Sequence, residues 1–458
     1  MFKSLTNSQT LATLLNAQHV GAAVDFAGVS TDSRAVSQGQ MFIALKGERF
    51  DGHAYLAQVA AKGVLVALVD NVQENCPLTQ IKVTDTRLAL GQIGALNRQQ
   101  FTGKLAAITG SSGKTTVKEM LASIMAAAVG REQVLATRGN LNNDLGVPLT
   151  LLELAESHQA AVLELGANHK GEIAYTVGLV KPHVVLINNA GTAHLGEFGG
   201  LENIVKAKGE ILQGLDEQGI AVLNRDDAAF STWQAMHGQK QLISFAKEQN
   251  SADFYAKNIH STNQGSQFTL CGLLGEHTVS INLLGEHNVS NALAAAACAY
   301  ALGFDAAAVI QGLQSMQAVK GRTLIHRFTQ NRCVIDDTYN ANPTSVCAAI
   351  DTLTGFAGRK LLVLGDIGEL GQWAEQSHSD VGEYANNKVD RLLAVGPLMA
   401  HAVAAFSGSA QHFCDQKGLI AALSEEFTDN TTVLVKGSRS AAMEHVVHAL
   451  CAANEEIH

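Results

Sequence analysis

Short apolar runs alternate with helical patterns along most of this chain, and this alternation limits the possible folds more than any other feature of the sequence. The runs are rich in β-branched residues and carry few charges, which is typical of parallel strands that are buried on both faces. The stretches between several of them repeat apolar residues at helical spacing, as in the segment 117–125. The pattern therefore predicts an α/β fold of parallel sheets covered by helices. The candidate strands are 105–109, 161–165, 183–188, 220–224, 360–366, 391–396 and 432–437.

The chain has 458 residues, which is more than one hydrophobic core normally supports, so we expect about three domains. Domain breaks are predicted near residues 80–104 and near 313–322. The 42 acidic residues outnumber the 32 basic ones, which argues against nucleic-acid binding because a polyanion requires a basic face. We find neither a signal-peptide pattern nor an apolar run long enough for membrane insertion, and the seven scattered cysteines form no C-x-x-C pair. These features predict a cytoplasmic protein.

A glycine-rich turn, TGSSGKTT at residues 109–116, joins the strand at 105–109 to an amphipathic helix. The glycines allow backbone N–H groups to approach phosphate oxygens, and the positive end of the helix dipole points at the same place. Lys114 would neutralise the charge of the β- and γ-phosphates, and the Thr115 hydroxyl would bind Mg²⁺. The turn is shorter than the general phosphate-loop pattern, since Ile108 stands where that pattern has its first glycine. We predict that ATP is bound by Gly110, Ser111, Ser112, Gly113, Lys114, Thr115 and Thr116.

An ordinary capped helix start is the alternative interpretation of this turn. It would not explain a lysine placed between glycine-assisted turns and two threonines, so nucleotide binding is the better interpretation.

Two polar residues follow neighbouring candidate strands. Glu164 lies near the end of the strand at 161–165, and His194 lies beyond the end of the strand at 183–188. Open α/β sheets bind ligands at the carboxyl ends of their strands. Each residue alone has an ordinary alternative: Glu164 as a hydrogen-bonded buried acid, and His194 as a loop histidine. Beside a phosphate loop on the same sheet edge, both are better interpreted as Mg²⁺ ligands. Lys206 and Lys208, in contrast, are most simply solvated helix lysines.

Ten segments, in the same order along nearly the whole chain, resemble motifs of the Mur ligase family. They are 30-STDSR, 43-IALKGERFDGHAYL, 109-TGSSGKTT, 139-GNLNNDLGVPLTLL, 164-ELGANHKGEI, 188-NNAGTAHLGEFG, 285-GEHNVSNALAA, 337-DTYNANPTS, 365-GDIGELG and 436-KGSRSAAME. The last three favour the family member that adds a dipeptide. One difference is Ile367, where the family often has Met, and this is a tolerated apolar exchange.

The resemblance implies three domains. Residues 1–84 would form an N-terminal α/β domain that binds a UDP-linked substrate. Residues 85–314 would form a central phosphate-loop domain that binds ATP, and residues 315–458 a Rossmann-like domain that closes over the site.

The resemblance also assigns roles to single residues. Lys114, Glu164, His194 and Lys208 would be catalytic, with Lys208 carbamylated so that it becomes an anionic ligand. The metal ligands of two Mg²⁺ ions would be Thr115, Glu164, His194 and Lys208. The remaining nucleotide contacts would be Asn288, Asn291, Arg322 and Asp337. The implied substrate contacts are Asp32, Ser33, Arg34, Lys46, Asn142, Asn143, Asn168, His169, Tyr339, Asn340 and Asn342.

Some of these assignments leave an alternative open. Asparagine and histidine at Asn142, Asn143, Asn168 and His169 could instead cap turns. Either dipeptide binding or domain closure could explain six positions in the motifs of the third domain: Tyr339, Asn340, Asn342, Lys436, Ser438 and Arg439.

The activity implied is ATP-dependent ligation of D-alanyl-D-alanine to UDP-N-acetylmuramoyl-tripeptide (UDP-MurNAc-tripeptide) by a monomer, through an acyl phosphate, in peptidoglycan precursor synthesis. A folylpolyglutamate synthetase is the nearest alternative, but it should lack the segments STDSR and KGERFDGH. A nucleotide-gated binding protein, in which ATP only switches conformation, is an alternative of a different class. The third residue of the tripeptide and the base that deprotonates the amine stay open at this point.

Overall fold

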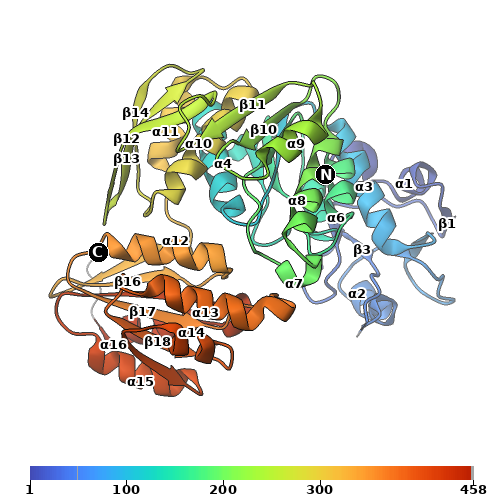
Figure 1. The fold of residues 1–458 in the computed structure, drawn as a ribbon. Helices are drawn as coiled ribbons and strands as arrows, with labels where there is room; N and C mark the ends of the chain where they lie inside the picture. Colours follow the sequence, from blue (N-terminus) through green and yellow to red (C-terminus); the bar gives the residue numbers. More distant parts are fainter. Residues whose placement is uncertain (49, 455–458) are drawn as a thin grey trace.

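The computed structural model describes residues 1–48 and 50–454 and contains three β-sheets, each built from its own stretch of the chain (Figure 1). The N-terminal unit is drawn in blue, the central unit runs from teal to yellow, and the C-terminal unit is orange and red. The predicted α/β fold with three domains is confirmed. The exact boundaries after residues 84 and 314 stay predictions.

The N-terminal sheet has five strands in the order β1-β5-β4-β3-β2, and only β1 runs antiparallel to its neighbour. Helix α3 begins after Asp85, whose side chain accepts hydrogen bonds from the backbone N–H groups of Arg87 and Leu88. Leu90 and Ile93 of α3 share an apolar core with this sheet, so α3 packs on the first unit although it follows residue 84. The elements are α1 (Ser8–Leu14), β1 (Gln18–Val20), β2 (Val29–Ser30), β3 (Met41–Ile43), α2 (Leu56–Ala61), β4 (Val66–Val69), β5 (Thr79–Lys82) and α3 (Thr86–Gln100).

The central sheet has nine strands in the order β14-β13-β12-β11-β10-β9-β6-β8-β7. The strands from β7 to β12 are parallel, and β13 and β14 continue the sheet as an antiparallel ribbon. The strands are β6 (Lys104–Thr109), β7 (Val134–Ala136), β8 (Ala160–Glu164), β9 (Val184–Ile187), β10 (Ile220–Asn224), β11 (Leu242–Ala246), β12 (Phe254–Thr262), β13 (Gly265–Gly272) and β14 (His277–Ile281).

Helices cover both faces of the middle of the central sheet, which is why its strands β6, β8 and β9 are buried along most of their length. Leu105 and Ala107 of β6 belong to one core cluster, and Ala106 and Ile108 belong to the cluster on the other face. This alternation follows from the two-residue period of a strand. The helices are α4 (Lys114–Val129), α5 (Gly146–Leu152), α6 (Glu172–Val180), α7 (Leu195–Phe198), α8 (Leu201–Gly209), α9 (Phe230–His237), α10 (His287–Ala301) and α11 (Ala306–Ser315).

The C-terminal sheet has six strands in the order β15-β16-β20-β17-β18-β19, and only β15 is antiparallel. Helix α12 starts with Pro343, and Asn342 and Ser345 form a capping box at its N-terminus. Figure 1 shows α12 on the side that faces the central unit. The elements are β15 (Leu324–Phe328), β16 (Arg332–Asp337), α12 (Pro343–Thr354), β17 (Arg359–Gly365), α13 (Ala374–Ala385), β18 (Arg391–Val395), α14 (Met399–Ala405), β19 (Ser409–Phe413), α15 (Gln416–Glu426), β20 (Thr431–Lys436) and α16 (Glu444–Ala453).

Across residues 1–48 and 50–454, every helix is too short or too polar to cross a lipid bilayer.

Candidate active site

The topology of the central sheet brings the predicted nucleotide and metal residues to one edge. Strand β6 lies between β8 and β9, and Ile108 at the end of β6 pairs with Glu164 at the end of β8. The phosphate loop follows β6 directly, so it begins beside this carboxylate. The Thr115 hydroxyl donates a hydrogen bond to Glu164 Oε2 at 2.7 Å. The phosphate loop and Glu164 therefore lie in contact, as the order of the strands led us to expect.

Two glycines give the phosphate loop its shape. Gly110 and Gly113 have φ values of +152° and +77°, and the second lies in the left-handed region that favours glycine. A Cβ atom on Gly113 would also lie 2.5 Å from Asn291 Oδ1 and 2.6 Å from Asn188 Nδ2. The loop therefore lies too close to these two asparagines for any larger residue at position 113.

The start of α4 presents free backbone donors. The first backbone hydrogen bond of the helix runs from Val117 N to Gly113 O, and within the described chain no backbone or capping acceptor binds the N–H groups of residues 114–116. Ser111 N and Ser112 N donate to Asn189 Oδ1 at 3.1 and 2.8 Å. Free N–H groups at a helix N-terminus attract phosphate.

Lys114 lies in this loop without a carboxylate bound to it. Its Nζ donates to Gly110 O at 2.8 Å. Burial lowers the pKa of Lys114. The charge of Glu164 raises this pKa by a smaller amount, and the charge of Arg322 lowers it further. The ammonium therefore gains from an added negative charge, as a nucleotide phosphate would supply.

Glu164 is buried, and its carboxylate accepts hydrogen bonds from Thr115 Oγ1 at 2.7 Å and Asn142 Nδ2 at 2.9 Å. In the part of the chain that the structure describes, it forms no ion pair within 4.0 Å with a lysine, arginine or histidine. A buried carboxylate held only by neutral donors at the edge of a phosphate site is a suitable ligand for a divalent cation.

His194 makes a contact between domains. It precedes α7 with a φ of +58°, and its Nδ1 lies 2.7 Å from Glu369 Oε2 of the C-terminal unit. The adjacent imidazole lowers the pKa of Glu369. The other ring nitrogen, Nε2, forms no contact with a protein acceptor among the described residues.

Lys208 differs from the expectation of a solvated lysine. It is 1% exposed, whereas Lys206 on the same helix is exposed as expected. Lys208 is buried because α8 packs this side against Phe198, whose ring centroid lies 5.7 Å from Lys208 Nζ. Desolvation lowers its pKa to about 7, and the positive charge of Lys114 adds to the effect.

The protein side chains offer only part of a Mg²⁺ coordination shell. Among residues 1–48 and 50–454, no three His, Cys, Asp or Glu side chains cluster so that they could hold a metal ion by themselves. Mg²⁺ usually takes one or two carboxylates and completes its shell with phosphate oxygens and water. The Thr115–Glu164 pair at the phosphate loop fits that pattern.

The remaining predicted nucleotide residues surround the loop. Asn291 Nδ2 donates to Asn288 Oδ1 at 2.9 Å, and both residues are buried on α10. Arg322 Nη2 donates to Thr115 Oγ1 at 2.9 Å, and its guanidinium lies 4.2 Å from the centre of the Tyr339 ring. Arg322 therefore reaches the loop from the start of the C-terminal unit.

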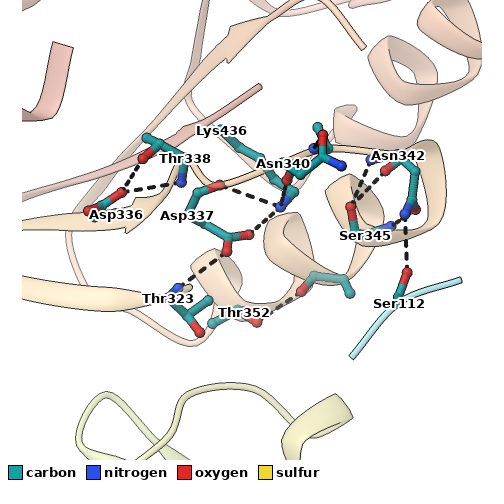
Figure 2. Close-up of polar contacts among 12 residues, drawn as sticks. Ser112, Thr323, Asp336, Asp337, Thr338, Asn340, Asn342, Ser345, Thr352 and Lys436 are labelled. Carbon is teal, nitrogen blue, oxygen red and sulfur yellow. Dashed lines mark hydrogen bonds and ion pairs between the residues drawn. The ribbon is translucent and has the colours of Figure 1, made fainter. Parts of the chain in front are cut away.

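Asp337 is paired within its own unit. Its Oδ2 lies 2.5 Å from Lys436 Nζ, and its Oδ1 accepts a hydrogen bond from Thr323 N at 3.2 Å (Figure 2). Figure 2 also shows Asn342 reaching from this unit to Ser112 Oγ of the phosphate loop, at 3.2 Å.

A cavity of about 1260 Å³ joins these groups between the central and C-terminal units. Most predicted site residues line it, whereas Gly110 lies outside its lining. The predicted residues in its wall are Ser111, Ser112, Gly113, Lys114, Thr115, Thr116, Asn142, Asn143, Glu164, Asn168, His169, His194, Lys208, Asn288, Asn291, Arg322, Asp337, Tyr339, Asn340 and Asn342.

The sequence interpretation did not select several residues of this wall, among them Asn188, Asn189 and Glu444. The two asparagines directly follow β9, and that position at a strand end was a usable signal.

The predicted contacts for the uridine nucleotide lie outside this cavity, on the N-terminal unit. Arg34 forms a bidentate pair with Asp32, with Nε–Oδ1 and Nη2–Oδ2 distances of 3.0 and 2.8 Å. This hydrogen bonding lowers the pKa of Asp32 to about 2. The Lys62 ammonium, which sequence reasoning missed, donates to the backbone oxygens of Ser33 and Arg34. Lys46 forms a backbone bridge with Asp51 in the neighbouring loop.

Comparison with known proteins gives a consistent result over the full chain. Three family models match: "Mur ligase family, catalytic domain" at residues 25–98, "Mur ligase middle domain" at 108–299, and "Mur ligase, glutamate ligase domain" at 321–439. The UDP-N-acetylmuramoyl-tripeptide–D-alanyl-D-alanine ligase of Escherichia coli (strain K12) is 45% identical over 450 residues, which cover 98% of each protein.

Solved structures show the same similarity. MurF from Acinetobacter baumannii is 41% identical, with a TM-score of 0.91 over 97% of this chain and 98% of that one. MurF from Thermotoga maritima in complex with ADP is 27% identical, with a TM-score of 0.82 over 92% of this chain and 96% of that one. With three family models in order and a 45% identical relative over nearly its whole length, this chain belongs to the Mur ligase family.

Proposed function

We propose that this protein is the ATP-dependent ligase that joins D-alanyl-D-alanine to UDP-MurNAc-tripeptide, giving the pentapeptide, ADP and phosphate. The observation that carries the proposal is the shared cavity, in which the phosphate loop and Glu164 face polar groups of the C-terminal unit. The relatives that match over the full chain bear the name of this ligase. The reaction belongs to cytoplasmic peptidoglycan precursor synthesis, and we expect a monomer to perform it.

The first step activates a carboxylate, which is a poor acyl donor. A carboxylate oxygen of the tripeptide attacks the γ-phosphorus of ATP, the bond to the bridging oxygen breaks, and ADP leaves from the acyl phosphate. Lys114 and the free N–H groups at the start of α4 would neutralise the charge that develops on the phosphoryl oxygens. Mg²⁺, held by Thr115 and Glu164, would screen the repulsion between the two anionic reactants.

In the second step the neutral amine of the dipeptide attacks the acyl carbon. The C–N bond forms, the C–O bond to phosphate breaks, and inorganic phosphate leaves while the amine loses its proton. Water would destroy the acyl phosphate, so a covered site favours ligation. Contacts such as Asn342 Nδ2 with Ser112 Oγ and Thr192 Oγ1 with Thr344 Oγ1, both at 3.2 Å, hold the C-terminal unit over the loop.

Carbamylation of Lys208 is part of this proposal. Only a neutral amine adds to CO₂, and with its pKa lowered to about 7 Lys208 is largely neutral at slightly alkaline pH. The carbamate would replace an unpaired cation near Lys114 by an anion that Lys114 attracts. It would also add an oxygen ligand beside Glu164 for a second Mg²⁺ ion.

The N-terminal unit would bind the UDP moiety through the turn that carries Asp32, Ser33 and Arg34, with Lys46 in the adjacent loop. His194 would provide Nε2 toward the metal, since its Nδ1 faces Glu369.

A phosphate-release assay tests the proposal. We expect phosphate only when ATP, UDP-MurNAc-tripeptide and D-alanyl-D-alanine are all present, and its loss when any one of them is omitted. Lys114→Ala should reduce turnover by about a hundredfold to a thousandfold, because one preorganised charge contact at a transition state is worth roughly 3–4 kcal/mol. Lys206→Ala, an exposed lysine of α8, is the matched control and should retain parent activity. Phosphate release that does not depend on the dipeptide, or near-normal turnover of Lys114→Ala, would contradict the proposal.

A further inference from the structure

The proposed ligation leaves one charge of the dipeptide without an assigned partner. D-alanyl-D-alanine reacts through its amine, and its carboxylate enters the cavity unchanged. A carboxylate taken out of water needs a compensating cation or several hydrogen-bond donors. The residues that meet this carboxylate should therefore be found among the cations that line the cavity.

Most lysines and arginines in the cavity wall already have a partner or a role near the nucleotide. Arg87 is paired with Asp144, and Lys436 is buried and paired with Asp337. Arg322 donates to Thr115. Lys114 and Lys208 lie beside the phosphate loop and belong to the proposed phosphate and metal site.

Two cations in the wall remain with free donors, Lys320 and Arg439. Lys320 is exposed and makes no hydrogen bond among the residues that the structure describes. It precedes Gly321 and Arg322, on the nucleotide side of the C-terminal unit. Arg439 follows β20, and its side chain is 67% exposed into the cavity region.

Arg439 is held at its base and at one end of its guanidinium. Its backbone N–H donates to Asn340 Oδ1 at 3.2 Å, and its Nη1 donates to Glu444 Oε1 at 2.8 Å. Its Nε and Nη2 make no hydrogen bond in the described part of the protein. These two nitrogens form the edge of the guanidinium that binds a carboxylate through two parallel hydrogen bonds.

Asn340 adds a second donor at the same place. Its Oδ1 is used by the backbone N–H groups of Ala341 and Arg439, at 2.9 and 3.2 Å. Its Nδ2 therefore points away from these bonds, and it has no acceptor among residues 1–48 and 50–454. Figure 2 shows Asn340 beside Lys436 and Asp337, whose ion pair stabilises this turn.

We propose that the free edge of the Arg439 guanidinium, together with Asn340 Nδ2, binds the terminal carboxylate of the dipeptide substrate. Glu444 fixes the guanidinium through Nη1 and leaves the opposite edge for the substrate. Arg439 lies in the C-terminal wall and the phosphate loop in the central wall, so a dipeptide held by its carboxylate directs its amine across the cavity toward the acyl phosphate. This inference rests on the proposed ligation and makes Arg439 a determinant of substrate specificity.

The test compares D-alanyl-D-alanine with D-alanyl-D-alaninamide, which lacks only the carboxylate charge. kcat and KM for each are measured by phosphate release at saturating ATP and UDP-MurNAc-tripeptide, in the parent, Arg439→Ala, Arg439→Lys and Lys320→Ala. The parent should prefer the acid by about tenfold or more in kcat/KM, which corresponds to about 1.4 kcal/mol. Arg439→Ala should raise KM for the acid by a similar factor and leave KM for the amide almost unchanged.

The variants separate a specific contact from a general loss of structure. Arg439→Lys should be intermediate, because a lysine keeps the charge but not the two-pronged geometry. Lys320→Ala should keep the parent preference for the acid. ADP affinity should stay at the parent value in Arg439→Ala, and the thermal midpoint should fall only slightly, since the arginine side of the ion pair is 67% exposed. If Arg439→Ala fails to fold, Arg439→Gln replaces it, because glutamine keeps most of the side-chain volume. The proposal then requires that Arg439→Gln loses the parent preference for the acid in kcat/KM.

Three outcomes would overturn the assignment of Arg439. The parent enzyme could show the same kcat/KM for the acid and the amide, or Arg439→Ala could keep the parent ratio of these two values. The third outcome is that Lys320→Ala, and not Arg439→Ala, loses the preference for the acid. An inactive parent enzyme would refute the proposed ligation itself, which is a different result.

Discussion

The three buried lysines of the described chain differ in whether their ammonium group has a protein partner. Lys118 and Lys436 are 2% and 3% exposed, and each donates to protein oxygens, Lys118 to Thr137 O at 2.7 Å and Lys436 to Asp337 and Asn340. Lys208 is 1% exposed, and in the described chain its Nζ forms neither a hydrogen bond nor an ion pair. An unmodified lysine at this position therefore costs folding free energy, which supports a modified side chain.

The charge of unmodified Lys208 should destabilise the protein at neutral pH. Its pKa is lowered to about 7 from 10.5, so the folded protein binds fewer protons than the unfolded chain between these values. The penalty is fully present below pH 7 and disappears as the pH rises above the unfolded value. We expect Lys208→Met to raise the thermal midpoint at pH 7 in CO₂-free buffer, by an amount corresponding to roughly 1–4 kcal/mol, with the difference shrinking toward pH 10.5.

The same variant tests the carbamate. With ¹³CO₂ held at constant pressure, the parent should show a carbamate signal in ¹³C NMR that grows as the pH rises through 7, and Lys208→Met should lack it. Lys206→Met is the control and should keep both the signal and the parent midpoint, because Lys206 is exposed. A lower midpoint in Lys208→Met would mean that this lysine has a stabilising partner.

At the scale of single elements, the loop before α4 depends on one glycine. Ala at position 113 would be strained at φ +77° and would press its Cβ against Asn291 Oδ1 and Asn188 Nδ2. We expect Gly113→Ala to weaken ADP binding by about tenfold or more in titration calorimetry, which is a loss of about 1.4 kcal/mol.

Gly178 of α6 is the matched control for this substitution. A Cβ there meets no atom within 4 Å, and the residue has helical geometry, so Gly178→Ala should keep the parent affinity and gain slightly in stability. Parent-like ADP affinity in Gly113→Ala would show that the nucleotide does not use this loop.

Most of the strands that the sequence predicted are continuous apolar runs, although the buried strands β4 and β11 were not selected. Strands β6, β8, β9 and β10 are buried along most of their length and read as apolar runs. Strand β12 was missed because most of its residues are half-buried or exposed, so its pattern gives no continuous apolar run. Strand β7 has only three residues, which is too short for any periodicity.

The residues of the candidate site also fall into those that a local sequence pattern reveals and those that depend on how elements pack together. The phosphate loop and Glu164 follow from strand ends, which the sequence shows. The burial of Lys208 depends on which side of α8 packs inward, and Lys206 two residues earlier points outward. The His194–Glu369 pair depends on how two sheets of different units meet, and no local pattern encodes that distance.

At the scale of the whole molecule, a close contact joins the central and C-terminal units beside the active site. Gly196 N donates to Glu369 O at 2.9 Å, next to the contact between His194 Nδ1 and Glu369 Oε2. A Cβ on Gly196 would lie 2.6 Å from Gly371 N and 2.8 Å from the carbonyl carbon of Leu370, so only glycine allows this approach. The contact orients His194 only while the two units are together.

Gly196→Ala should therefore separate the two units without removing any functional side chain. We expect a larger radius of gyration in small-angle scattering and a lower kcat, with ADP affinity changed much less because the phosphate loop is untouched. Gly178→Ala again serves as the control. Unchanged scattering together with full activity would show that this contact is not part of the active arrangement.

The central claim is that ATP phosphorylates the tripeptide carboxylate before the dipeptide reacts. Supplying UDP-MurNAc-tripeptide with ¹⁸O in its acceptor carboxylate tests it directly, because the oxygen lost from that carboxylate must leave with the phosphate. Mass spectrometry should find one ¹⁸O in each phosphate released, in step with formation of the pentapeptide. Unlabelled phosphate would instead show that water cleaves ATP, as in a nucleotide-driven switch, and would contradict the account.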